Sequence, residues 1–94
     1  MRDYEIVCII QADLDETTTN GVIEKVGGWI SDSGGAITKI DRWGKRRMAY
    51  AIRKQRDGYY VLYQAQIQPS FLAEFERNLK LQEPVLRHLV IAVE

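Results

Sequence analysis

Residues 59–67 alternate between apolar and more polar side chains, and this period of two restricts the fold more than any other pattern in the chain. Successive side chains of a β-strand point to opposite faces of a sheet, so the segment predicts a strand with one buried face. The core phase consists of Tyr59, Val61, Tyr63, Ala65 and Ile67, and the outward phase consists of Tyr60, Leu62, Gln64 and Gln66. Other elements must cover the buried side of this sheet.

Two apolar segments near the ends of the chain are also predicted as strands. Residues 4–11 are rich in β-branched residues and too short for a helix. Residues 85–93, VLRHLVIAV, form the last strand. In the first of these strands the core phase comprises Tyr4, Ile6, Cys8 and Ile10, which leaves Glu5, Val7 and Ile9 outward.

A long strand is predicted over residues 36–53, and a turn follows it at residues 53–58. The alternation is poor before Gly44 and clear after it, so Gly44 is a candidate β-bulge that re-aims the strand. We expect Tyr50 of this strand to lie in the core. The sequence signal for the turn is Asp57-Gly58.

Two helices are predicted between the strands. The first has Asp13 or Asp15 as its cap and ends at Gly34-Gly35. The second begins at Pro69 and is closed by Pro84. The apolar residues at helical spacing are Val22, Val26, Trp29 and Ile30 in the first helix and Leu72, Phe75 and Leu79 in the second.

The resulting order of elements, βαββαβ, predicts an α+β protein with the ferredoxin-like split βαβ fold: a four-stranded antiparallel sheet with two helices on one face. The 94 residues contain no repeat, linker or low-complexity segment, so we expect a single domain over residues 1–94. This fold carries enzymes, ligand sensors, RNA-binding proteins and structural subunits, so it decides no function by itself.

The sheet face that the helices leave open is predicted to carry apolar side chains. A contiguous apolar patch across neighbouring strands marks a partner more often than scattered apolar surface does. The alternative is that these side chains belong to ordinary surface. The predicted protein-partner residues are Val7, Ile9, Tyr60 and Leu62, with Leu89 or Ile91 of the last strand beside them.

A cluster of cations interrupts an otherwise neutral chain. Lys and Arg number 13, as do Asp and Glu, and eight of the 13 cations lie between Lys39 and Arg56. One interpretation is a solvated hairpin whose charges protect a sheet edge. The other is a phosphate-binding surface, because Arg grips phosphate bidentately and aromatic residues stack on RNA bases. The interleaved aromatic residues are Trp43, Tyr50 and Tyr60.

Little in the sequence points to catalysis, a cofactor or a membrane. Cys8 is the only cysteine, and we expect a small core hydrophobe in a reducing compartment. The carboxylates are dispersed, no metal-ligand spacing occurs, and His88 is expected to be a packed or surface histidine. We expect no enzymatic activity, no metal and no cofactor. No segment resembles a signal peptide or approaches a span of roughly 20 apolar residues, so a soluble cytoplasmic protein is expected.

Four segments, in order along essentially the whole chain, resemble the bacterial small-subunit ribosomal protein six family. They are Tyr4-Glu5 behind Arg2, the segment Trp43-Gly44-Lys45-Arg46-Arg47-Met48-Ala49-Tyr50, the strand start Gly58-Tyr59-Tyr60, and Val85-Leu86-Arg87. No single segment decides the resemblance, and the ordered set carries it. Two departures are the absence of a charged tail after Glu94, which many members carry, and Lys45 where many members have Arg.

The resemblance implies a structural constituent of the small ribosomal subunit without enzymatic activity, located on the ribosome in the cytoplasm. It implies binding to the central domain of small-subunit rRNA as a pair with small-subunit ribosomal protein eighteen. The isolated protein is expected to be a monomer. The expected RNA-binding residues are Arg2, Arg42, Lys45, Arg46 and Arg47, with Lys54 and Arg56 as further candidates.

Two alternatives from other classes remain open on the sequence. The first is a small-molecule-binding regulatory module on the same fold, which would have a polar, Gly-rich loop after the first strand. The second is an acyl-phosphate hydrolase, which would have a phosphate cradle in that loop. The loop reads QADLDETTTNG, and its three carboxylates would repel a phosphate.

Overall fold

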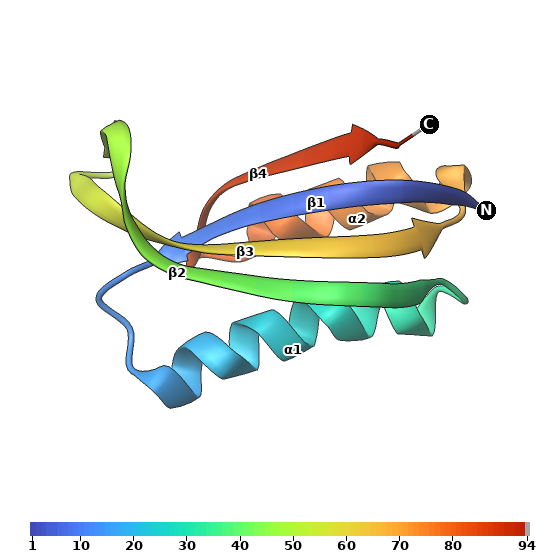
Figure 1. Ribbon diagram of the computed structural model, residues 1–94, viewed down its shortest axis with the longest axis horizontal. Coiled ribbons are helices and arrows are strands. Elements are labelled where there is room, and N and C mark those ends of the chain that lie inside the picture. Colours follow the sequence, from blue (N-terminus) through green and yellow to red (C-terminus); the bar gives the residue numbers. More distant parts are fainter. Residues whose placement is uncertain (94) are drawn as a thin grey trace.

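The computed structural model describes residues 1–93 and contains a four-stranded antiparallel sheet with strand order β2-β3-β1-β4 (Figure 1). In chain order the elements are β1 (Arg2–Gln11), α1 (Glu16–Asp32), β2 (Ala36–Ile52), β3 (Gln55–Ile67), a 3-10 turn (Pro69–Phe71), α2 (Leu72–Leu81) and β4 (Val85–Ala92). The predicted βαββαβ order and the ferredoxin-like α+β class are therefore confirmed.

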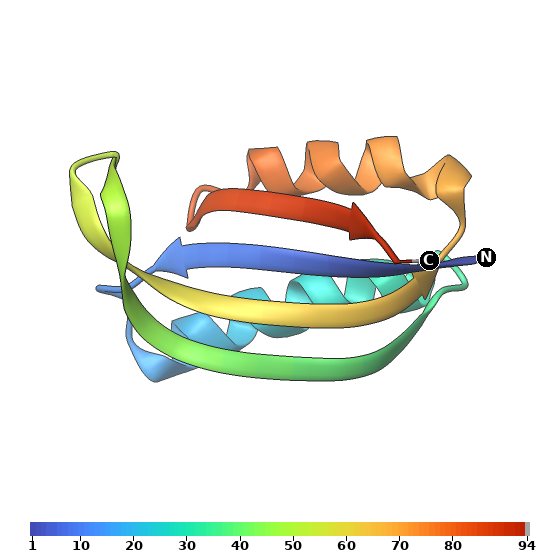
Figure 2. The same ribbon diagram turned by 45° about the horizontal axis from the view of Figure 1, so that its top comes forward.

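The central pair of strands, β1 and β3, orders the core. Ten successive residue pairs join them without a register shift, from Arg2 opposite Ile67 to Gln11 opposite Gly58. The predicted core phases of both strands therefore share one face, with Ile6 beside Tyr63. Both helices lie behind this face, and the other face is open (Figure 2).

Tertiary packing stabilises α1, whose sequence is rich in Thr and Gly and therefore a weak helix former. Asp15 caps the helix, since its Oδ1 accepts a hydrogen bond of 2.7 Å from the amide of Thr18. The chain leaves the helix through Gly34, whose φ of +88° favours glycine. The side chains that α1 buries against the sheet include Val22, Ile23, Val26 and Ile30, while Trp29 is only partly buried.

Helix α2 follows a 3-10 turn that begins at Pro69, and it ends before Pro84. Phe75 and Leu79 are fully buried on its inner face, as the spacing predicted. The two helices meet through aromatic contacts, in which Trp29 of α1 approaches the edge of Phe75 with ring centroids 6.4 Å apart.

Two titratable groups lie inside this core. The hydroxyl of Tyr63 donates a hydrogen bond of 2.9 Å to the backbone carbonyl of Ile23, which joins β3 directly to α1. Burial raises the pKa of this hydroxyl, so it stays protonated and keeps donating. Burial also raises the pKa of the Cys8 thiol from 9.0 to about 12, as expected for a packed cysteine rather than a reactive one.

The predicted bulge in β2 is confirmed. Gly44 has a φ of +82°, and the pairing with β3 shifts register between Arg42 and Gly44. Trp43 is the additional residue on the bulged strand, so it has no partner of its own in the ladder.

The predicted position of the β2–β3 turn is wrong. The turn consists of Arg53 and Lys54, both with positive φ, and Ile52 pairs with Gln55 across it. A two-residue hairpin turn requires such backbone angles, which Arg and Lys adopt here at the end of a long ladder. Gly58 lies within β3 for another reason: a Cβ at this position would stand 2.3 Å from Cγ2 of Ile9.

The expectation that Tyr50 lies in the core is also wrong. Its side chain is 60% exposed, because the end of the β2–β3 hairpin runs past the helices and curls over the end of the sheet (Figure 1). The hydroxyl of Tyr50 accepts a hydrogen bond of 2.6 Å from Nη1 of Arg87. Nη1 of Arg53 donates to the carbonyl of Glu83 at 2.7 Å, so the curled tip contacts the start of β4 and the loop before it.

Replacing Gly58 with Ala should lower the free energy of unfolding by about 1–3 kcal/mol, because the new methyl group must displace the side chain of Ile9. The matched control is Gly28→Ala in α1, where a Cβ meets no atom within 4 Å. That variant should be more stable by roughly 0.5–1 kcal/mol. Urea unfolding measures both, and equal shifts would contradict the close packing over Gly58.

Alkylation of Cys8 should be far slower in the folded protein than in urea-unfolded chains at pH 8, since the buried thiol is protonated. The folded pKa exceeds the ordinary value, so the thiol favours the folded state below pH 9 and loses this contribution as the pH rises toward about 12. A pulse of iodoacetamide followed by mass spectrometry measures the labelling. Fast labelling under native conditions would contradict the burial.

Candidate RNA- and protein-binding surfaces

The bulge at Trp43-Gly44 divides the cations of β2 between the two faces of the sheet. Arg42 lies opposite Val61 and Lys45 opposite Tyr59, and both partners belong to the core phase of β3. Residues directly opposite each other on paired strands point to the same face, so these two cations point toward the helix side. Arg46 lies opposite Gly58, in the outward phase.

Two hollows collect the cations of the helix side. Arg42 and Lys45 line one of about 280 Å³ beside the start of α1, where Arg42 also donates a hydrogen bond to Oδ1 of Asn20. Lys45 lines the second as well, which has a volume of about 500 Å³ and lies along the hairpin tip. The other cations that line the second hollow are Arg53, Lys54 and Arg56.

The hairpin cations are not neutralised within the chain. In the part that the structure describes, the one ion pair within 4 Å joins Nε2 of His88 to Oε1 of Glu76, at 3.3 Å. Arg47 has Asp57 opposite it in the ladder, yet their charged groups are not within 4 Å. Five of the seven predicted RNA-binding residues, Arg42, Lys45, Arg47, Lys54 and Arg56, thus lie along the hairpin as a positive surface.

Arg46 and Arg2 stand apart from that surface. The guanidinium carbon of Arg46 lies 5.5 Å from the ring centroid of Trp43, whose ring stacks on Tyr60 at 6.3 Å. Arg46 therefore borders the open face. Arg2 lies opposite Ile67 at the start of β1, at the other end of the molecule from the hairpin tip (Figure 1).

The open face, which is the sheet surface opposite the helices, brings the four predicted partner residues together. One row across the strands contains Leu62, Val7 and Leu89. The next row contains Tyr60, Ile9 and Arg87. Val7, Ile9, Tyr60 and Leu62 are half-buried, whereas Leu89 and Ile91 on the edge strand are 50% and 44% exposed.

Sequence reasoning missed two residues of this surface. Trp43 extends the apolar rows toward β2 through its contact with Tyr60. Arg87 adds a cation at the end of β4 and holds the curled tip through Tyr50. The outward phase of β4 would have indicated Arg87, but nothing in the sequence indicates the bulge partner of Trp43.

Catalytic or metal-binding geometry is not found in residues 1–93. No group of three or more His, Cys, Asp or Glu side chains there is placed to hold a metal ion. The helices of this segment include none with the length and apolar character that crossing a membrane requires.

The surfaces and the fold agree with the comparison to protein families. Residues 3–92 match the family model for ribosomal protein S6. The chain belongs to the ribosomal protein S6 family. As a member of this family it is a structural protein of the small ribosomal subunit and not an enzyme.

Relatives match the chain over its full length. It is 46% identical to small ribosomal subunit protein bS6 of Moorella thermoacetica, over 100% of this chain and 96% of the relative. Identity to the bS6 protein of Streptomyces coelicolor is 37%, over 100% and 98%. The crystal structure of 30S ribosomal protein S6 from Thermotoga maritima superimposes with a TM-score of 0.93 at 27% identity, covering 98% of this chain and 87% of that one.

Membership in the S6 family favours the ribosomal function over both alternatives left open by the sequence. The loop after β1, which a hydrolase or ligand sensor would use, is instead the connection that carries the cap of α1. Its carboxylate at Asp15 has a lowered pKa because it accepts hydrogen bonds from Thr18. The negative charge at this helix start disfavours phosphate binding there.

Proposed function

We propose that this protein binds the central domain of small-subunit rRNA together with small-subunit ribosomal protein eighteen. In this proposal residues 1–94 act as one ribosomal-protein domain, which needs no cofactor and is monomeric until it meets its partner. The family resemblance supports the pairing, and the positive surface of the β2–β3 hairpin is the observation that carries the RNA contact.

The hairpin cations suit phosphate contact rather than recognition of bases. They are exposed, they lie on both sides of one twisted ribbon, and they have no carboxylate partner within 4 Å in residues 1–93. Phosphate contacts of this kind position a protein on a shaped RNA without specifying sequence. We assign this role to Arg42, Lys45, Arg46, Arg47, Lys54 and Arg56, and we assign Arg2 to a separate contact at the other end of the molecule.

The open face suits the protein partner. Val7, Ile9, Tyr60 and Leu62 form adjacent rows that water only partly covers, and Leu89 and Ile91 continue them to the sheet edge. Contact with a second protein would remove this apolar surface from water, at roughly 25 cal/mol for each Å² buried. Hairpin and open face share β2 and β3, so a partner on one surface lies close to RNA on the other.

The Arg46→Ala/Arg47→Ala double variant should bind rRNA with a weaker dependence on salt. Each phosphate contact contributes about 0.7–0.9 to the slope of log affinity against log salt, so the slope should flatten by about one to two units. The measurement is RNA titration at several salt concentrations. Lys25→Ala/Arg77→Ala, which removes two exposed cations from the helices, is the matched control and should leave the slope unchanged.

Saturating ribosomal protein eighteen should tighten rRNA binding by at least about tenfold, or about 1.4 kcal/mol, because the pair presents two weak contacts in a fixed orientation. Linkage requires RNA to tighten the protein pair by the same factor. RNA titration with and without the partner, at one near-physiological salt concentration, measures the effect. Equal affinities would contradict cooperative binding.

The Leu62→Asp variant separates the two surfaces. Leu62 is half-buried on the open face, so the variant should fold, bind RNA weakly as before, and lose the enhancement by the partner. Leu81→Asp, at an exposed leucine on α2, is the matched control and should keep the enhancement. A collapsed thermal transition in Leu62→Asp would instead place this side chain in the core.

A further inference from the structure

The two ends of the open face carry opposite charge. At the end that includes the start of β1, Asp3 lies opposite Gln66, and Glu5 lies opposite Gln64 on one side and Ile91 on the other. At the end beside the hairpin, the charged groups are Arg46 and Arg87. The apolar rows of the open face lie between these ends. A partner that covers the whole face therefore meets carboxylates at one end and guanidinium groups at the other.

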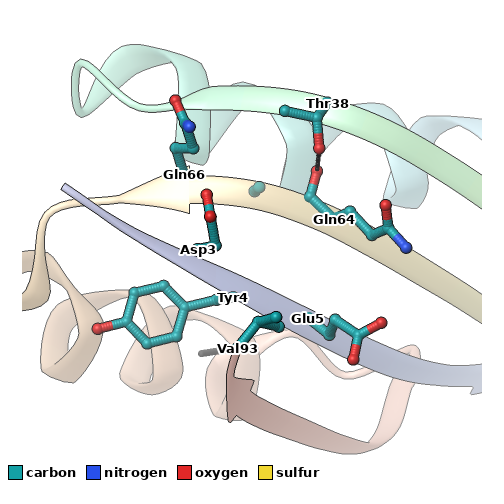
Figure 3. A pocket seen from close by; sticks show the side chains of 8 residues that line it. Asp3, Tyr4, Glu5, Thr38, Gln64, Gln66 and Val93 are labelled. Atoms are coloured by element: carbon teal, nitrogen blue, oxygen red, sulfur yellow. Dashed lines mark hydrogen bonds between the residues drawn. The ribbon is translucent and has the colours of Figure 1, made fainter.

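A hollow of about 400 Å³ lies at the acidic end, between β1, β2 and β3. Asp3 and Glu5 of β1 border it together with Gln64 and Gln66 of β3 (Figure 3). Thr38 of β2 closes it, where its Oγ1 donates a hydrogen bond of 3.0 Å to the carbonyl of Gln64. Carboxylate and side-chain amide oxygens give the hollow several hydrogen-bond acceptors.

No cation within residues 1–93 neutralises these carboxylates. Lys39 lies opposite Gln64 on the same face, and the amino terminus lies two residues before Asp3, yet neither forms an ion pair within 4 Å. Glu5 is already half-buried, whereas Asp3 is exposed. Both carboxylates are now solvated, and they would lose that water if a protein covered the apolar rows beside them.

Covering an unpaired carboxylate costs several kcal/mol, because the charged form loses hydration and gains nothing in return. A partner that docks on this face must therefore bring positive charge to its acidic end. We propose that the protein partner on the open face places a Lys or Arg side chain in the hollow bordered by Asp3 and Glu5, while its apolar side chains cover the row of Leu62, Val7 and Leu89. This inference rests on the proposed function, since it specifies the chemistry of the partner contact.

The cation contact would set the orientation of the partner more than its affinity. Apolar contact over the central row is non-directional, whereas opposite charges at the two ends of the face permit one direction of docking. RNA does not suit the acidic end, because Asp3 and Glu5 repel phosphate. The face thus separates the protein contact at the start of β1 from the cations beside the hairpin.

The test is titration calorimetry of purified ribosomal protein eighteen against this protein at low and near-physiological salt. Asp3→Asn/Glu5→Gln should bind about tenfold more weakly at low salt, and the difference from the native chain should shrink as salt rises. Asp3→Glu/Glu5→Asp, which keeps both charges, should retain most of the affinity. The matched control is Glu24→Gln/Glu74→Gln on the helices, which should bind as the native chain does. Thermal melts verify that every variant is folded.

The outcomes separate this inference from the proposed function. Native chain that binds the partner and loses binding on Leu62→Asp, but not on neutralisation of Asp3 and Glu5, would overturn the cation contact alone. Absence of binding by the native chain would overturn both. Two other occupants have their own signatures, and either would overturn the inference. Dimers of this protein alone that Leu62→Asp dissolves would identify a second copy on the face. Tighter RNA binding by the neutralised variant that Leu62→Asp abolishes would identify RNA there.

Discussion

Two helices can cover only one face of a four-stranded sheet, and the other features of this protein depend on that constraint. The helices bury the continuous apolar phase of β1 and β3, from Tyr4 to Ile67, against α1 and α2. The opposite phase of the same strands remains open, and it contains Val7, Ile9 and Leu62 rather than only polar residues. The sheet is thus complete as a fold and incomplete as a surface, which is the condition expected of a subunit that works inside an assembly.

The backbone of β2 connects this incomplete surface to the cations. One additional residue at the bulge directs Trp43 toward Tyr60 and the open face, while Arg42 and Lys45 turn to the helix side. A regular strand would have had no such change of phase at this point. The long hairpin then extends past the helices, so its cations are free of the core and available to an external partner. A local feature of one strand therefore distributes two kinds of surface over a small protein.

The core phases of β1 and β3, the inner faces of both helices and the bulge at Gly44 could all be predicted, because each rests on local periodicity or on glycine chemistry. The turn could not. Asp57-Gly58 is a strong turn signal, but Gly58 is needed where Ile9 passes closely over β3, a contact between residues far apart in the chain. Tyr50 likewise has a core-like phase, and its exposure follows only from where the hairpin outruns the helices.

The sequence by itself determined the element order, the fold class, the family resemblance and the clustering of cations between Lys39 and Arg56, since these depend on residue type and spacing along the chain. Only the tertiary structure decided which cations share a surface, why Arg2 is remote from the rest, and that Asp3 and Glu5 face the same side as the apolar rows. The physical reason is that strand register and a bulge set the direction of each side chain, and pairing between distant segments fixes both.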